Sequence, residues 1–415
     1  MGTARASVGG APVRGPAFWR VGGFHPMFDW DFTQQSPGAL VLPTGLTFAR
    51  ASSGHSVQTG TSTLVTSGIT SNDVGRIGRL SDSHSRGLFI EPARTNLYVR
   101  ARSANLAAGT AGAACAYTTG RTGPDGTTNA IRGQTASGAY SRFEAIGSIT
   151  GNHVLSAWTA QGLGSGAYQV VGAYAGTAGG AVQGTASAAW NRVASSAFSY
   201  PAASTAYINP WDGRANTTLG SSAGARDCDL DFVQFEAGKY PTSAIITSGG
   251  SSATRAAERL TIDSTRASQS TVNGRLGFYV RFRAIAALTE MDGSAEGQIL
   301  FGVGTTCSVR ISAASRYIII EDASGSKWSQ TANSVITWAR GDLVEMVMEL
   351  GNGVSSFRWR INGGSVNTAS FTARNDSLDP IVPSSGLDVL CAGTNWHTPA
   401  VIERATLFVP GRGPL

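Results

Sequence analysis

The chain has 415 residues, which is long enough for two or three domains with well-buried cores. Its hydrophobic content of 41% excludes wholesale disorder, and its formal net charge is +6. Only Lys239 and Lys327 are lysines, and the arginines are spread along the chain, which argues against a nucleic-acid-binding stripe.

No segment predicts membrane insertion or export. No apolar run approaches the ~18–20 residues that cross a bilayer, and residues 1–16 lack the apolar core of a signal peptide. We therefore expect assembly in a reducing cytoplasm. The cysteines have no C-x-x-C spacing, so a zinc site is not expected and buried free thiols are favoured, with pairing of Cys115 with Cys228 or of Cys307 with Cys391 left open.

Residues 1–26 predict an extended N-terminal arm, because Gly and Pro interrupt any helix or strand there. A segment of this composition frays unless something holds it. We expect a partner subunit or the rest of the chain to do so through Arg14, Phe18, Trp19 and Arg20, since aromatic and arginine side chains are common interface anchors. The alternative, that Phe18 and Trp19 cap the protein's own core, is equally open.

Residues 27–98 predict a short β-region. Apolar and acidic residues alternate over 28–32, which places Asp29 and Asp31 on one face of a strand. Two carboxylates there could bind a cation or act as an acid/base pair, but a solvated face is the favoured interpretation. Residues 46–50 and 88–90 read as further strands.

Residues 99–250 predict an antiparallel β-sandwich, because short strand-like runs are separated by Gly, Ser and Asn turns. One of these runs carries Asp227, Asp229 and Asp231 on a single face. A calcium site is conceivable there, but a solvated edge strand is the favoured interpretation.

Residues 251–275 are Ser-, Thr- and Gly-rich at their start and predict a linker. Residues 276–415 predict a second β-sandwich, with Asn362-Gly363 as a type I′ hairpin turn. The overall fold class is therefore all-β: two antiparallel, jelly-roll-like sandwiches that follow the arm and the short β-region.

Several motifs occur in one order along the chain: "LTFARASSG" (46–54), "GLFIEPARTNL" (87–97), "GPDGTTNAIR" (123–132), "AWNRVASSAF" (189–198) and "DFVQFEAGKYPTSAIITSGGSSATRAAERL" (231–260). In the residues of these motifs and in their order, the chain resembles a family of bacteriophage tail and virion structural proteins. In that family an "RGLLIEE-RTNL" signature precedes a carbohydrate-binding-module-like sandwich. The later pattern "WARGD" (338–342) with "INGG" (361–364) resembles concanavalin-A-like or laminin-G-like domains more loosely.

No catalytic motif accompanies these patterns, so we expect no catalytic residue, cofactor or metal ion. Glycan sites combine an exposed aromatic ring with amide and carboxylate groups. Two segments offer such groups in expected loops: Trp211-Asp212 and Asn395-Trp396-His397. The alternative is that each Trp caps a core or an interface, and this alternative is favoured.

The resemblance implies a structural protein of the virion. Our first hypothesis is an external appendage, such as a tail fibre, collar or head fibre, that binds other virion proteins (capsid, portal/collar or tail) through the arm and recognises host surface polysaccharide. It would be a homo-oligomer, for instance a trimer. The second hypothesis is a capsid decoration or cement protein without a ligand, and the third is a polysaccharide depolymerase, which the missing motifs disfavour.

Overall fold

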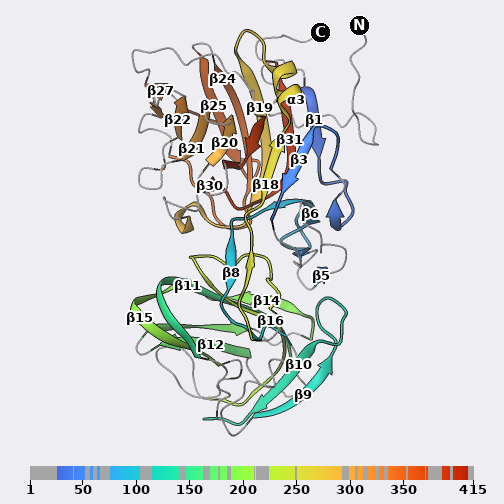
Figure 1. Cartoon of the computed structure of the whole chain (residues 1–415), viewed down its shortest axis with the longest axis vertical. Coiled ribbons are helices and arrows are strands. Elements are labelled where there is room, and N and C mark those ends of the chain that lie inside the picture. The colour runs from blue at the N-terminus through green and yellow to red at the C-terminus, as the bar shows by residue number, and fades with distance from the viewer. Residues whose placement is uncertain are drawn as a thin grey trace. The chain divides into compact units, whose positions relative to one another are not determined.

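The structure is a computed structural model (Figure 1). It describes residues 26–409 except 41, 52–56, 59–62, 66–74, 103–114, 140–144, 162–168, 176–177, 185–187, 210, 212–223, 248–249, 292–298, 304–306, 312–315, 317, 323–326, 331–334, 352–353, 370, 373–385 and 393–395.

The protein is an all-β protein, as the sequence predicts. Every strand pairing in the described part of the chain is antiparallel. The chain divides into two compact units: unit 1 comprises 1–51, 72–92 and 257–415, and unit 2 comprises 52–71 and 93–256. Both segments of unit 2 are therefore insertions in the sequence of unit 1.

Unit 1 contains two large sheets (Figure 1). The first has the order β2 (Gly38–Leu40), β6 (Gly75–Gly78), β7 (Gly87–Ile90), β31 (Ala400–Phe408), β19 (Leu276–Ala284), β24 (Leu343–Gly351), β25 (Val354–Ile361) and β26 (Asn367–Ala369), with β1 (Pro26–Asp31) also on β31. The second has the order β27 (Phe371–Thr372), β23 (Lys327–Gln330), β22 (Ile318–Asp322), β21 (Cys307–Ile311), β20 (Ile299–Val303), β28 (Leu387–Val389), β18 (Arg259–Ile262) and β3 (Leu46–Ala49). The rings of Phe278 on β19 and Phe301 on β20 lie 4.8 Å apart, so the two sheets pack face to face.

The strands within residues 27–98 pair with later strands of unit 1 as well as with one another. β31 pairs with β7 over residues 400–402 and with β1 over residues 404–408, and β3 pairs with β18. All nine residues of β31 are buried, so its backbone groups need partners on both sides, and the early strands supply one of them. The early strands thus complete the C-terminal sandwich, a long-range pairing that local pattern does not show.

Residues 251–275 contain regular structure, in contrast to the predicted linker. They form β17 (Ala253–Arg255), β18 and the helix α3 (Ser264–Ser270). Leu260 and Ile262 are buried on β18, and the Asp263 side chain caps α3 by accepting a hydrogen bond from the Arg266 amide at 2.7 Å. β18 is only four residues long, so its apolar–polar alternation is a weak signal in the sequence.

Unit 2 is built on one large sheet whose strand order is β13 (Ala178–Gly184), β12 (Gln169–Ala175), β15 (Phe198–Asn209), β11 (Ala145–Gln161), β16 (Arg226–Ala237), β10 (Ala130–Thr135) and β9 (Cys115–Arg121), with β14 (Asn191–Ala194) on β11. Unit 2 also contains two separate two-stranded sheets: β8 (Arg94–Asn96) with β17, and β4 (Val57–Gln58) with β5 (Leu64–Val65). The 17-residue β11 pairs along one edge first with β15 and then with β14. The remaining described elements, all in unit 1, are β29 (Cys391–Ala392), β30 (Trp396–His397) and the 3-10 turn η1 (Leu288–Glu290).

The predicted turn at Asn362-Gly363 is confirmed. Both residues have positive φ, +50° for Asn362 and +72° for Gly363, as a type I′ turn requires. The Gly364 amide donates to the Ile361 carbonyl at 2.9 Å, which closes the turn between β25 and β26.

Candidate functional site

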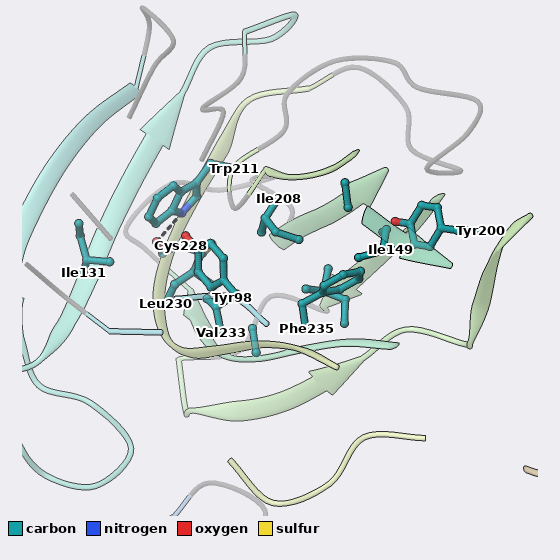
Figure 2. Close-up of a cluster of buried hydrophobic side chains, with 13 residues drawn as sticks. Tyr98, Ile131, Ile149, Tyr200, Ile208, Trp211, Cys228, Leu230, Val233 and Phe235 are labelled. Carbon is teal, nitrogen blue, oxygen red and sulfur yellow. Dashed lines mark hydrogen bonds between the residues drawn. The ribbon is translucent and has the colours of Figure 1, made fainter. Parts of the chain in front are cut away.

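Trp211 is a core residue, so the prediction that it forms an exposed glycan platform does not hold in this structure. Figure 2 shows its ring among the buried apolar side chains of unit 2. Its Nε1 donates to the Cys228 carbonyl at 3.1 Å, and a Cβ added at Gly133 would meet the ring at 2.2 Å. The glycine and the indole are therefore fitted to each other, and the interpretation that this Trp caps a core applies.

The second predicted loop is described only in part. Trp396 and His397 form β30, which pairs with β29, and His397 is buried. Asp212 and Asn395 lie outside the described residues. The same is true of the four predicted anchoring residues of the arm, which are Arg14, Phe18, Trp19 and Arg20.

The three aspartates of β16 do not lie on an edge strand, in contrast to the favoured prediction. β16 lies between β11 and β10, and each carboxylate meets an arginine from another segment. The shortest distances are 2.8 Å for Arg132–Asp227, 3.2 Å for Arg121–Asp229 and 2.7 Å for Arg102–Asp231. The described residues contain no group of three or more His, Cys, Asp or Glu side chains placed to hold a metal ion.

The sheet of unit 2 carries a band of polar side chains on the face opposite its hydrophobic core. We call it the polar face, and it consists of Thr118, Arg121, Arg132, Gln134, Asp227 and Asp229. The residues between them along the strands, such as Tyr117, Ile131 and Cys228, pack in or against the core, because successive side chains of a strand point to opposite faces.

The register of three neighbouring strands brings the polar face together. Arg132 on β10 lies opposite Asp229 on β16 and Thr118 on β9, and Gln134 lies opposite Asp227. Thr118, Arg121 and Gln134 are exposed, whereas Arg132 and Asp229 are buried. The band therefore has buried charges beneath exposed hydrogen-bonding groups.

The charges of the polar face are held by hydrogen bonds. Arg132 donates to both oxygens of Asp227, at 2.8 and 3.1 Å, and the Gln134 amide donates to Asp227 Oδ2 at 3.0 Å. Burial alone would raise the pKa of Asp227, but these hydrogen bonds and the Arg132 charge lower it below the ordinary value. Asp227 is therefore ionised at neutral pH and is not suited to act as a general acid.

Asp229 has spare hydrogen-bonding capacity. Its Oδ2 accepts from Arg121 Nε at 3.3 Å and Nη2 at 3.2 Å. Its Oδ1 is buried and has no hydrogen-bond partner among the residues that the structure describes. An unmet carboxylate oxygen costs free energy unless a water or a ligand donates to it, so Asp229 offers an acceptor at this face.

Arg102 ties the turn before β10 to β16. It donates to Asp231 Oδ1 and Oδ2 at 2.8 and 2.7 Å and to Asp125 Oδ1 at 3.0 Å, and its guanidinium lies 3.9 Å from the centre of the Phe232 ring. Burial raises the pKa of Asp231 to about 6 despite Arg102. A Cβ at Gly123 would meet Asp231 Oδ2 at 2.4 Å, so this turn requires glycine for close approach.

Near the margin of the polar face lies a second aromatic group. Trp190 is half-buried, packs against Trp158 and Phe232, and donates from Nε1 to the carbonyl of Thr122 at 3.1 Å. Thr122 directly follows Arg121, so an indole is placed next to the end of β9.

The motifs that carry the family resemblance supply buried supports in unit 1. Glu258 from "TRAAERL" accepts from Arg76 Nε and Nη2, both at 2.6 Å, and from Arg50 of "LTFARASSG" at 3.2 Å. Arg76 also donates to Glu91 of "GLFIEPARTNL" at 2.6 Å. All four side chains are buried, and we call them the ion-pair cluster.

The same motifs supply a buried polar network in unit 2. Asn96 Nδ2 donates to the carbonyls of Val233 and Ile245 at 3.2 and 3.0 Å, and its Oδ1 accepts from the amides of Tyr98 and Phe235, both at 3.0 Å. All four hydrogen-bonding positions of this amide are therefore used. Asn96 joins β8 to β16 and to the segment that follows β16.

Glu236 anchors that following segment. Its carboxylate accepts from Gln234 at 2.6 Å, from the Thr242 hydroxyl at 2.9 Å, and from the Thr242 amide. Burial raises the pKa of Glu236, although the Arg94 charge and the Thr242 amide oppose the shift. These described motif residues support the fold, whereas Arg132 of "GPDGTTNAIR" and Trp190 of "AWNRVASSAF" lie on the polar face and at its margin.

The structure also shows the surroundings of the two aspartates of β1 and of three cysteines. Asp29 accepts from Arg404 and Thr406, and Asp31 accepts from the Thr33 amide and hydroxyl, so both carboxylates of β1 have protein partners. Cys115, Cys228 and Cys391 are free thiols, and nothing is described of the Cys307 side chain.

No described helix has the length and apolar character needed to traverse a bilayer.

The sequence showed only part of the polar face. The alternation that places Asp227 and Asp229 on one face is visible along β16, but their partners Arg121, Arg132 and Gln134 were missed. The period-2 pattern of 130–135 was an available signal for Arg132 and Gln134. Period 2 along 115–121 would place Arg121 on the face of Tyr117, and it is the register shift between β9 and β10 that brings Arg121 to the polar face.

Comparison with known proteins adds little. No model of a known protein family matches the chain, and no curated protein matches it. Among solved structures, one titled "NanB plus Optactamide" is similar at 16% identity, over 37% of this chain and 24% of that chain, with a TM-score of 0.26. The chain thus spans about a quarter of that structure, and a TM-score this low carries no argument about fold or function.

Proposed function

We propose that the protein is a bacteriophage virion structural protein: an external appendage that attaches through residues 1–26 and binds host surface glycan through the polar face of unit 2. The observation that carries the glycan-binding part is the polar face itself. It presents exposed hydroxyl, amide and guanidinium groups over ordered carboxylates, which is the mixture of donors and acceptors that sugar hydroxyls require.

The virion part of the proposal is supported by the motifs. Those that resemble the phage family, where the structure describes them, contribute the ion-pair cluster and the Asn96 network, which are scaffold elements. A protein whose recognisable residues maintain its fold suits a durable particle component.

A binding role rather than a catalytic one is also part of the proposal. The described carboxylates with raised pKa values, Asp231, Glu236 and Glu403, are each buried beside arginines. Asp231 has a second carboxylate nearby, Asp125, but Arg102 Nη2 bridges the two at 2.7 and 3.0 Å, so an arginine lies where the sugar would have to lie between the two carboxylates of a glycoside hydrolase. Release of reducing sugar from a bound polysaccharide would contradict this part.

Deleting residues 1–26 tests the attachment. The truncated chain should fold, because Pro26 at the start of β1 is the one residue of 1–26 that belongs to a described strand, and it should be lost from assembled particles. Wild-type occupancy of the truncated protein in particles would refute attachment through the arm.

A second measurement separates an appendage from a cement protein. Full-length protein is mixed with empty capsids and, separately, with host cells. Binding to cells that is weakened by Gln134→Ala and unchanged by the control Asn367→Ala, an exposed amide of unit 1, is the expected result. Binding to capsids alone, with a rise in capsid stability, would point to a cement protein instead.

A further inference from the structure

The charges of the polar face are balanced within the protein. Arg121 and Arg132 carry two positive charges, and Asp229 and Asp227 carry two negative charges, so 2 − 2 leaves no formal net charge. Each guanidinium already has a carboxylate partner. An acidic ligand would have to displace a protein carboxylate from its arginine, and the two negative charges would then lie side by side.

The unmet group on this face is an acceptor rather than a donor. Asp229 Oδ1 is buried and lacks a hydrogen-bond partner among the described residues, while Asp229 Oδ2 accepts a hydrogen bond from Arg121. A sugar hydroxyl or amide N–H can donate to that oxygen, whereas a ligand carboxylate or sulfate cannot. The Arg121 side chain is 44% exposed, so it can move to admit a ligand hydroxyl.

From these observations, and resting on the proposed glycan-binding function, we infer that the polar face of unit 2 selects uncharged, hydroxyl-rich saccharides over acidic ones. One ligand hydroxyl donates a hydrogen bond to Asp229 Oδ1, and the ligand accepts hydrogen bonds from Arg121 and from the Gln134 amide. Adjacent hydroxyls on one sugar ring can do both at once. Trp190, beside the end of β9, offers an apolar surface at the margin of this site.

The test uses the full-length protein on an array that carries neutral oligosaccharides and their uronic-acid, sialylated and sulfated counterparts. Wild-type protein should bind neutral members and not the matched acidic members. Asp229→Asn should weaken neutral binding by about tenfold, because a hydrogen bond to a charged acceptor is lost. It should also admit acidic sugars, because Arg121 is then left without its counter-charge.

Asp388→Asn is the matched control. It removes the carboxylate partner of Arg259 in unit 1, where the arginine side chain is 38% and the aspartate side chain 4% exposed, against 44% and 9% for Arg121 and Asp229. This control should leave the array profile unchanged. Thermal unfolding of both variants establishes that each one folds.

The outcomes separate the two proposals. Wild-type binding to acidic sugars in preference to neutral ones would overturn the selectivity inferred here and leave glycan binding intact. Neutral binding that Asp229→Asn and Arg121→Gln both leave unchanged would overturn the location. Absence of binding to every sugar on the array, with binding to capsids retained, would overturn the glycan-binding function itself.

Discussion

Truncation of Glu258 should destabilise unit 1 more than any surface charge change. This carboxylate accepts from Arg76 at 2.6 Å twice, from Arg50 at 3.2 Å and from the Glu91 amide at 3.1 Å, and its side chain is fully buried. Glu258→Ala would leave two buried guanidiniums competing for the remaining carboxylate, Glu91. Breaking a buried ion pair by removing one partner costs about 3–5 kcal/mol.

The arginines cannot escape this cost by losing a proton. Burial alone would lower the pKa of Arg76, but Glu258 and Glu91 raise it well above its ordinary value, so the intact cluster is charged. Without Glu258 the guanidinium still keeps its charge, because arginine is not deprotonated in proteins. The free energy of unfolding is measured by urea denaturation, with calorimetry to separate the two units. The expected loss is about 3–5 kcal/mol for Glu258→Ala. Glu321→Ala, which breaks the partly exposed Arg310–Glu321 pair, should cost no more than about 1 kcal/mol.

A double variant tests whether the cost comes from buried charge that has lost its partner. Arg76→Met combined with Glu258→Leu removes one charge of each sign, which leaves Arg50 and Glu91 in the cluster with no net charge. It should be less destabilising than Glu258→Ala alone, which leaves two buried arginines with one carboxylate. A loss below about 1 kcal/mol for Glu258→Ala would refute the reasoning, since it would mean that solvent reaches Arg50 and Arg76 and replaces the carboxylate.

Three further predictions concern the other elements. Trp211→Ala should lower the stability of unit 2 by about 3–5 kcal/mol in urea denaturation, as expected for a buried Trp, and should leave glycan selectivity unchanged wherever the variant remains folded. Because the pKa of Asp231 is raised to about 6 in the folded state, unit 2 should gain roughly 2–3 kcal/mol as pH falls from about 6 to about 4. The sign follows because the folded state binds this proton more tightly than the unfolded state, and Asp231→Asn should abolish the contribution of this group; an unchanged pH profile would contradict the assignment. Asn362→Ala should cost about 1–2 kcal/mol, through its φ of +50° and the loss of hydrogen bonds with Leu343 and Asp342, and Asn362→Gly should cost less because glycine accepts that φ.

Local pattern was enough to identify the class of fold. The short strand-like runs over 99–250 and the Asn362-Gly363 turn predicted antiparallel strands, because the side-chain period of a strand and the φ preference of a turn act over a few residues. The same alternation placed Asp227, Asp229 and Asp231 on one face before their surroundings were known.

Folding in three dimensions settled the partners of those residues. The arginines that pair with the three aspartates lie 95 to 129 residues away in the chain. Along one edge, β31 pairs with β1 and β7, which come from the other end of the sequence of unit 1. Trp211 looks like a loop residue in the sequence, yet its ring fills the space above Gly133. Strand formation is a property of short segments, whereas burial and charge pairing depend on which distant strands become neighbours, and neighbouring residues in the sequence carry little information about that choice.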